Sequence, residues 1–256
     1  MLKLFIYGLI SMSLLSVDMV KLEGVEDIIK VTSLKVKPVV YNINMVDLEN
    51  NIVQIKKENF INLMLPSILL AKEEIKNLKE EVVELVELVN KKNIGEKDKD
   101  RLEYIYKKYK VEVGNSKELL KRLNTIPVDI ALAQAIIESG WGTSRFSREG
   151  NNIYGIWSFR ETEDRMEASH GVRNGKKVYL RKYEYIYECV LDYFYSLAVG
   201  ANYESLREKM LANSDSLLLI EELEGYSEIR GEYVKRLKSV ITFNKLDKFN
   251  SYMLQE

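Results

Sequence analysis

Glu138 can transfer a proton, and Gln134 can donate and accept hydrogen bonds. Their spacing in the sequence predicts that the two side chains lie close together. They lie four residues apart in the segment 126–140, which reads IPVDIALAQAIIESG, so in a helix they share one face. The remaining residues are apolar on nearly all sides, which is typical of a core helix. Burial and the negative end of the helix dipole both disfavour a charged carboxylate at this C-terminal end. The pattern therefore predicts a raised pKa for Glu138, as a general acid needs. An ion pair with a residue such as Arg145 is the alternative.

The next segment, Ser139–Trp157, is rich in residues that could bind a carbohydrate. It contains four glycines, two tryptophans and two consecutive asparagines. Aromatic rings offer flat faces for sugar rings, and amides can pair with hydroxyl and acetamido groups. The alternative is a tight helix–loop–helix whose aromatic side chains fill the core. The candidate binding residues are Gln134, Trp141, Asn151, Asn152, Tyr154, Gly155 and Trp157, together with His170 further along the chain.

Composition excludes several other kinds of site. The 256 residues include 38 Lys+Arg and 39 Asp+Glu, and this balance argues against a nucleic-acid-binding protein. Cys189 and His170 are the single cysteine and the single histidine. An intrachain disulfide and a zinc site of several His and Cys ligands are therefore excluded. We expect no metal and no cofactor, and a nucleophilic site that needs a histidine would have to use His170.

The first 18 residues have the composition of an export signal. Lys3 precedes a mostly apolar run from Leu4 to Val17. This run fits a signal peptide but is short for a bilayer-spanning helix, which needs about 20 residues. We predict a signal peptide or an N-terminal anchor over residues 1–18, with a buried first helix as the alternative. An uncleaved signal would be the protein's contact with the inner membrane.

The elements expected around the candidate residues are mainly helical. Apolar residues recur at helical spacing over residues 60–89, where Pro66 is expected to bend the helix. Residues 34–41 alternate as in a strand until Pro38 interrupts them, and residues 19–55 are interpreted as a pro-segment or loosely docked arm. An Asn174-Gly175 turn signal predicts a β-hairpin between the flanking segments 167–173 and 176–183. Further helices are expected over residues 100–109, 116–123, 187–199, 202–212 and 232–242.

A long run of residues carries a resemblance to a known family. It comprises ALAQA at 131–135, ESGWGTSRF at 138–146, REGNN at 148–152, Gly155 and Trp157. This run resembles the glucosaminidase domain of bacterial cell-wall hydrolases, and most closely its Bax-like branch. Phe60–Glu74 is similar to the family's leading helix and Tyr226–Ile241 to its closing helix. The resemblance assigns residues 56–256 to a glucosaminidase domain and leaves 19–55 as an arm of unknown role.

The resemblance implies a fold and an activity. The expected fold is mainly α, a lysozyme-like α+β fold with a predominantly helical lobe and a small β-hairpin lobe. The expected activity is that of an exported endo-β-N-acetylglucosaminidase. It would be a monomer in the periplasm or cell envelope that cleaves the β-1,4 bond after N-acetylglucosamine in the glycan strand of peptidoglycan. By position, Glu138 would be the proton donor, and Tyr226, in the Gly-Tyr turn, would line the site.

The second catalytic group is where the sequence departs from the family. Related enzymes carry an acidic residue a few positions before the hairpin turn, where this chain has His170 and Gly171. Glu167 is the nearest carboxylate and the predicted second group. His170, a water held by polar groups and the substrate's own acetamido group are alternatives. The stereochemical outcome stays open, as do two rival functions: a lytic transglycosylase with the same acid, and a non-catalytic wall-binding scaffold.

Overall fold

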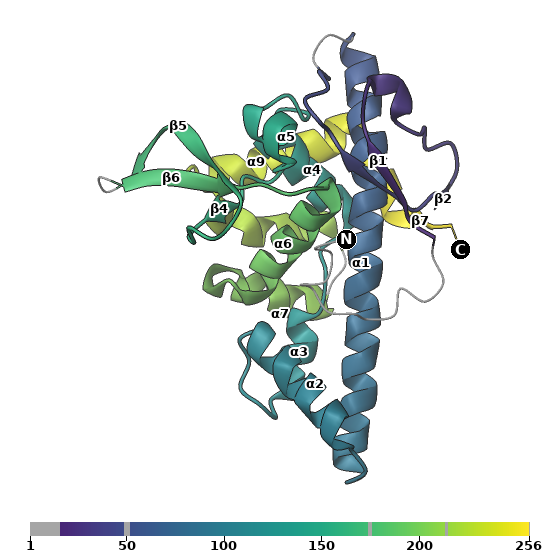
Figure 1. Ribbon diagram of the computed structural model, residues 1–256, viewed down its shortest axis with the longest axis vertical. Coiled ribbons are helices and arrows are strands. Elements are labelled where there is room, and N and C mark those ends of the chain that lie inside the picture. The colour runs from purple at the N-terminus through teal and green to yellow at the C-terminus, as the bar shows by residue number, and fades with distance from the viewer. Residues whose placement is uncertain (1–15, 49–51, 174–175, 213–214, 256) are drawn as a thin grey trace.

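A computed structural model describes residues 16–48, 52–173, 176–212 and 215–255. Helices dominate and the sheets are small (Figure 1), which confirms the mainly-α α+β class predicted from the sequence. Most of the predicted export signal and the Asn174-Gly175 turn lie outside the described residues. Among the described residues, no helix is both long enough and apolar enough to cross a membrane.

Helix α1 (Val53–Asn90) lies along the long axis of the molecule. Its 38 residues give a length of about 57 Å at 1.5 Å per residue. The helix starts before the predicted segment and continues through Pro66. The residues around the proline, from Leu63 to Ala71, are all buried. Packing on every side of this stretch therefore offsets the hydrogen bond that proline cannot make.

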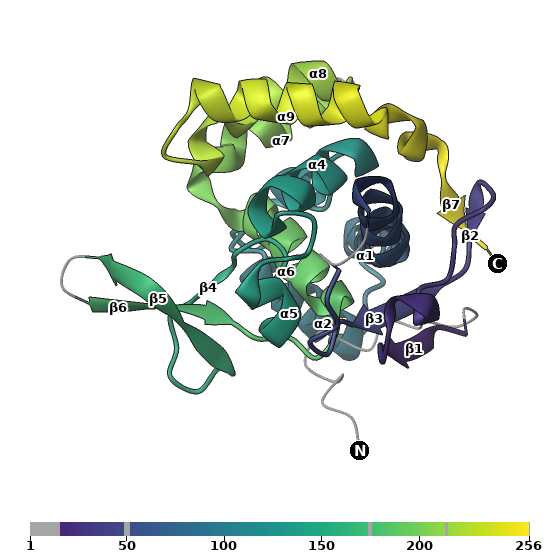
Figure 2. The same ribbon diagram turned by 90° about the horizontal axis from the view of Figure 1, so that it is seen from above.

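The helical lobe is built around the core helix α4 (Val128–Ser139). This helix contacts α1 as well as α9 (Gly231–Asn244). Figure 2 shows α9 lying across α4, with β5 and β6 projecting away from the helices. The remaining helices are α2 (Glu96–Lys108), α3 (Ser116–Arg122), α5 (Arg145–Gly150), α6 (Ile186–Val199), α7 (Glu204–Ala212) and α8 (Ser216–Leu219), with 3-10 helices η2 (Val25–Asp27), η3 (Ala201–Tyr203), η4 (Ile220–Tyr226) and η5 (Leu246–Ser251).

The β-lobe is a three-stranded antiparallel sheet. Its order is β4 (Trp157–Ser158), β6 (Lys176–Arg181), β5 (Arg165–Arg173). Arg181 Nη1 donates to Asp192 of α6 at 2.5 Å, and the Tyr183 hydroxyl donates to the same carboxylate at 2.6 Å. The predicted hairpin arms are thus present as β5 and β6, and their base is tied to the helical lobe.

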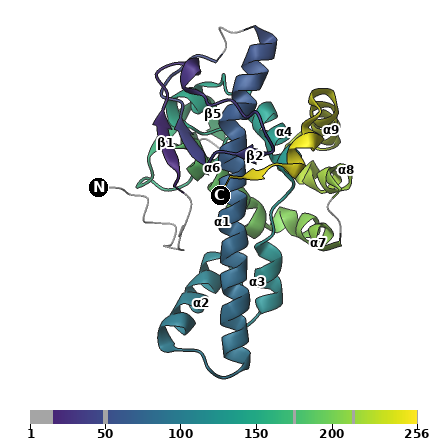
Figure 3. The ribbon, with the colours of Figure 1, turned by 90° about the vertical axis from the view of Figure 1, so that its right-hand side faces the viewer.

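The N-terminal arm packs into the core instead of docking loosely. Strand β1 (Asp18–Lys21) pairs in parallel with β3 (Val39–Asn42), and β2 (Lys35–Val36) pairs in parallel with β7 (Met253–Leu254) near the C-terminus. Figure 3 shows β1 on one side of α1 and α9 on the other. Because Leu22, Tyr41, Ile43 and Leu48 are fully buried, the arm is part of the hydrophobic core.

Candidate active site

Helix α4 carries Glu138 from the core to the surface. Pro127 precedes the helix in an extended conformation, and Gly140 ends it in the left-handed conformation (φ +60°), where glycine is favoured. Residues 128–136 are all buried, whereas the Glu138 side chain is exposed to solvent. A core helix thus presents one carboxyl group at its end.

A chain of hydrogen bonds holds that carboxyl group in place. The Tyr193 hydroxyl donates to Gln134 Oε1. Gln134 Nε2 donates to the Tyr233 hydroxyl at 2.9 Å, and this hydroxyl donates to Glu138 Oε1 at 2.9 Å. Gln134 and Tyr233 are buried, so Glu138 is oriented by groups that have little freedom to move. Gln134 therefore positions Tyr233 instead of contacting a ligand itself.

Burial and one tyrosine hydroxyl set the pKa of the Glu138 carboxyl group, which lies among several tyrosines. The Tyr226 ring stacks on the Tyr233 ring with centroids 5.5 Å apart. Burial, with the negative charge of Glu138 as a further cause, raises the pKa of Tyr203, Tyr226 and Tyr233. Although Glu138 reaches solvent, loss of surrounding water raises the pKa of its carboxyl group, and the Tyr233 hydrogen bond opposes this increase. The direction agrees with the sequence-based expectation.

The alternative ion pair between Glu138 and Arg145 is not formed. Arg145 binds Glu149 at 3.2 Å and donates to the Glu167 backbone oxygen at 2.5 Å. Within the described ranges, no basic side chain forms an ion pair with Glu138. Its carboxyl group is therefore not held ionised by a neighbouring cation.

Replacing Tyr233 by Phe is expected to move the alkaline limb of the pH–activity profile to higher pH. The hydroxyl stabilises the charged carboxylate, so its removal raises the pKa of Glu138 further. The acid then keeps its proton over a wider pH range. The measurement is kcat against pH on a soluble glycan substrate, with Tyr104→Phe, a tyrosine exposed on α2, as the matched control. A profile unchanged from wild type would contradict this assignment.

Tyr233 was missed by sequence reasoning, which chose Tyr226. The Tyr226 ring lies beside that of Tyr233, but its hydroxyl points to the Tyr154 backbone oxygen at 3.4 Å. A signal for Tyr233 existed in the sequence. It occupies the same helical face as Leu237 and Ile241, both buried, and a tyrosine at a core position needs a partner for its hydroxyl.

The asparagines predicted to bind a ligand are used inside the protein. Asn151 accepts from the Ile43 amide at 2.8 Å and donates to the backbone oxygens of Tyr183 and Glu184 at 3.0 Å. Asn152 likewise bonds to backbone groups of Ile156 and Arg181. Both are buried. We therefore assign them the role of joining α5, the arm and the β-lobe, in place of the predicted ligand contact.

Tyr154 and Gly155 also shape the site from within. The Tyr154 ring stacks on Tyr193 at 3.8 Å, and its hydroxyl donates to the Ala131 backbone oxygen at 3.2 Å. Gly155 adopts φ +67°, which favours glycine. The Tyr154 side chain thus fills the core, as the alternative interpretation of this segment predicts.

The two tryptophans remain within reach of a ligand. Trp157 on β4 is 37% exposed, and its ring lies 6.1 Å from that of Phe159, which is 79% exposed. Trp141 is half-buried and packs edge-on against Phe60. Trp157 and Phe159 together offer flat apolar faces on the β-lobe suited to stacking with a sugar ring.

The predicted second group lies on the β-lobe. Glu167 is on β5, and its exposed carboxylate pairs with Lys177 of β6 at 3.0 Å. The backbone of His170 belongs to β5, and its side chain lies outside the described part of the chain. No described contact joins Glu167 to Glu138, so its assignment stays a prediction.

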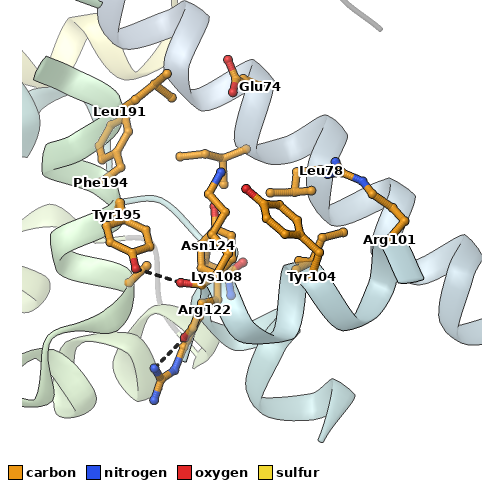
Figure 4. A pocket seen from close by; sticks show the side chains of 14 residues that line it. Glu74, Leu78, Arg101, Tyr104, Lys108, Arg122, Asn124, Leu191, Phe194 and Tyr195 are labelled. Atoms are coloured by element: carbon orange, nitrogen blue, oxygen red, sulfur yellow. Dashed lines mark hydrogen bonds between the residues drawn. The ribbon is translucent and has the colours of Figure 1, made fainter. Parts of the chain in front are cut away.

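Glu74 is a second carboxyl group with a raised pKa, caused mainly by burial. It accepts from the Tyr187 hydroxyl and lines an enclosed pocket between α1, α2 and α6 (Figure 4). The pocket's free volume of about 40 Å³ has room for only a few water molecules. Glu74 therefore cannot serve a saccharide in this arrangement, whereas Glu138 faces solvent.

Comparison with known protein families finds a match to the part of the chain that contains Glu138. The family model for mannosyl-glycoprotein endo-beta-N-acetylglucosaminidase matches residues 114–246. The chain belongs to this glucosaminidase family. The matched region includes Glu138 and Tyr233, as well as the entire β-lobe.

Two known proteins are similar in sequence to part of this chain. Protein bax of Escherichia coli is 30% identical over 142 residues, which are 51% of this chain and 49% of that protein. Exo-glucosaminidase LytG of Bacillus subtilis is 23% identical over 144 residues, 54% of this chain and 50% of that protein. The chain thus spans about half the length of each relative.

Two solved structures are also similar. The catalytic domain of the autolysin Auto from Listeria monocytogenes matches with a TM-score of 0.40 and 18% identity, over 70% of this chain and 87% of that one. A peptidoglycan hydrolase from Sphingomonas sp. A1 matches with a TM-score of 0.40 and 22% identity, over 55% and 90%.

Proposed function

We propose that this glucosaminidase-family protein is an endo-β-N-acetylglucosaminidase that hydrolyses the glycan strand of peptidoglycan. The observation that carries the proposal is the Glu138 carboxyl group, which is exposed at the end of a core helix, has a raised pKa and is oriented by Tyr233. A carboxyl group that keeps its proton can act as the general acid of glycoside cleavage.

In the proposed reaction, Glu138 donates its proton to the glycosidic oxygen after N-acetylglucosamine. The bond to the sugar C1 breaks, and positive charge develops on the ring. The resulting Glu138 carboxylate is stabilised by the Tyr233 hydroxyl, which already donates to Oε1. Tyr226 contributes by packing against the Tyr233 ring, and Trp157 offers a stacking face for the sugar.

The second group must stabilise the cation or activate water. Glu167 is the β5 carboxylate proposed for this role, and it forms an ion pair with Lys177 at the β-lobe surface. His170, a held water and the substrate's acetamido group are the competing proposals. Glu167→Gln discriminates among them, because a loss of activity comparable to that of Glu138→Gln is expected only if Glu167 is this group.

Export follows from the proposed substrate. Peptidoglycan lies outside the cytoplasmic membrane, and residues 1–18 have the composition of a signal peptide or anchor. The proposed location is therefore the periplasm or cell envelope, with the glycan strand as the macromolecular partner of a monomer.

Mass spectrometry of fragments released from purified cell walls tests the reaction type. Hydrolysis after N-acetylglucosamine is expected to leave N-acetylglucosamine at the new reducing ends. Anhydro-muramic acid ends would instead identify a lytic transglycosylase.

Fragment length tests the endo mode of cleavage, since one relative is named an exo-glucosaminidase. Long oligosaccharides at early times are expected for the endo mode, and disaccharides alone would contradict it.

A further inference from the structure

A groove lined by lysines lies beside the end of α4. It has a volume of about 550 Å³ and runs between the start of α1, the end of α9 and η5. We call it the lysine groove and define it by Lys57, Asn62, Trp141, Phe243, Lys245 and Lys248. Its volume far exceeds that of the enclosed pocket beside Glu74, so it can take a ligand of several residues.

The groove carries an excess of positive charge. Lys245 and Lys248 are exposed and lack an ion pair with any described carboxylate, and Glu58 is the single acidic residue in the described lining. Lys57 Nζ lies 5.1 Å from the Trp141 ring and 4.9 Å from the Phe243 ring. The lining therefore favours anionic groups, with one carboxylate left to meet a cation or an N–H donor.

The groove also has a hydrogen-bond donor without a partner. Asn62 is 5% exposed, and its Oδ1 accepts from the Val31 amide at 3.1 Å. Its Nδ2 has no partner within the described parts of the chain. A buried donor left unpaired costs free energy, and an acceptor from a ligand would satisfy it. Phe243, which is 78% exposed, adds an apolar face to the lining.

The groove is within reach of the proposed acid. Trp141 lines it and follows Glu138 by three residues. Three residues span at most about 11 Å, so the groove wall lies within that distance of Glu138 along the backbone. A peptide of three to five residues extends about 10–18 Å. A peptide attached to a sugar near Glu138 can therefore reach the Trp141 edge of the groove, and a peptide of five residues extends from there toward Lys245.

We propose that the lysine groove binds the carboxylate-bearing stem peptide attached to the glycan strand. This inference rests on the proposed function. Such a peptide supplies carboxylates for Lys245 and Lys248, backbone acceptors for Asn62 and apolar side chains for Phe243. Glu58 favours a peptide over a polyphosphate chain, which carries negative charge but no N–H donor to offer that carboxylate.

Equilibrium binding at low ionic strength tests the proposal without turnover. The full chain carrying Glu138→Gln is titrated with the free stem peptide, with N-acetylglucosaminyl-N-acetylmuramic acid, and with the same disaccharide bearing the peptide. The peptide-bearing disaccharide is expected to bind more tightly than the bare one. Lys245→Gln combined with Lys248→Gln is expected to weaken peptide binding by about fivefold, as partly exposed ion pairs allow.

Lys97→Gln combined with Lys99→Gln is the matched control, because it makes the same charge change at exposed positions of α2. Equal weakening by both pairs would overturn the proposal, as would equal binding of the two disaccharides. Glycerol-phosphate oligomers that bind as tightly as the peptide would overturn it in favour of an anionic polymer. Peptide binding without wall digestion by the wild type would refute the proposed function alone, whereas digestion without peptide binding would refute the groove alone.

Discussion

Glu138→Gln is expected to lower the rate of peptidoglycan digestion by about 10²–10⁴-fold, the range contributed by a positioned general acid. Glutamine has the shape of glutamic acid and keeps an oxygen to accept the Tyr233 hydrogen bond, but it cannot give up a proton. The loss should therefore appear in kcat, with the thermal unfolding midpoint close to that of wild type. The measurement is release of reducing ends from purified walls.

Glu74→Gln is the matched control for this substitution. Glu74 shares a raised pKa with Glu138 and also accepts from a tyrosine hydroxyl, but it lines a pocket too small for a sugar. Its replacement is expected to leave digestion unchanged. Digestion by Glu138→Gln at the wild-type rate would refute the catalytic proposal. Equal losses in the two variants would point to a general effect on the fold.

Local patterns predicted the core helix and the hairpin well. Between Pro127 and Gly140, capping preferences and the apolar run define α4 with little help from the rest of the chain. The four-residue spacing also correctly placed Gln134 and Glu138 on one face, where both bond to Tyr233. The hairpin arms followed from alternation and a turn signal, which are equally local.

Contacts between distant segments could not be predicted in this way. Tyr233 reaches Glu138 across 95 residues of sequence, and nothing in either local pattern specifies that pairing. The arm was interpreted as a pro-segment or a loosely docked segment, since Pro38 interrupts its strand-like alternation. In the structure its strand β2 pairs with β7 near the opposite end of the chain. Tertiary packing, and not the propensity of such short segments, decides these pairings.

The asparagines show how one residue type serves two purposes. An Asn-Asn pair in a glycine-rich loop fits both a ligand site and a turn that satisfies the backbone, since asparagine tolerates a left-handed conformation and bonds locally. Asn151 has φ +51° and ends α5. The sequence could not distinguish these roles, because the backbone groups that Asn151 contacts belong to segments 32 and 108 residues away.

Asn151→Ala is expected to lower the free energy of unfolding by about 3–5 kcal/mol. The substitution leaves the buried Ile43 amide without its acceptor, removes two bonds to the base of the β-lobe, and places alanine at a positive φ. The measurement is urea-induced unfolding followed by circular dichroism. Because a domain's total free energy of unfolding is about 5–15 kcal/mol, the Asn151 side chain would account for a large part of this stability.

Asn151→Gly separates the backbone strain from the lost hydrogen bonds. Glycine accepts a positive φ without strain, so this variant should recover about 1 kcal/mol relative to alanine while still lacking the three bonds. The glycine variant, assayed where it remains folded, should also keep the wild-type KM, since a residue that joins α5, the arm and the β-lobe does not contact substrate. A raised KM together with wild-type stability would restore the ligand-binding role that the sequence suggested. The change in stability and the change in KM, measured on the same variant, therefore distinguish two roles for Asn151. A loss of stability assigns it to the framework that positions Glu138 and the β-lobe, and a raised KM assigns it to the surface that binds the sugar.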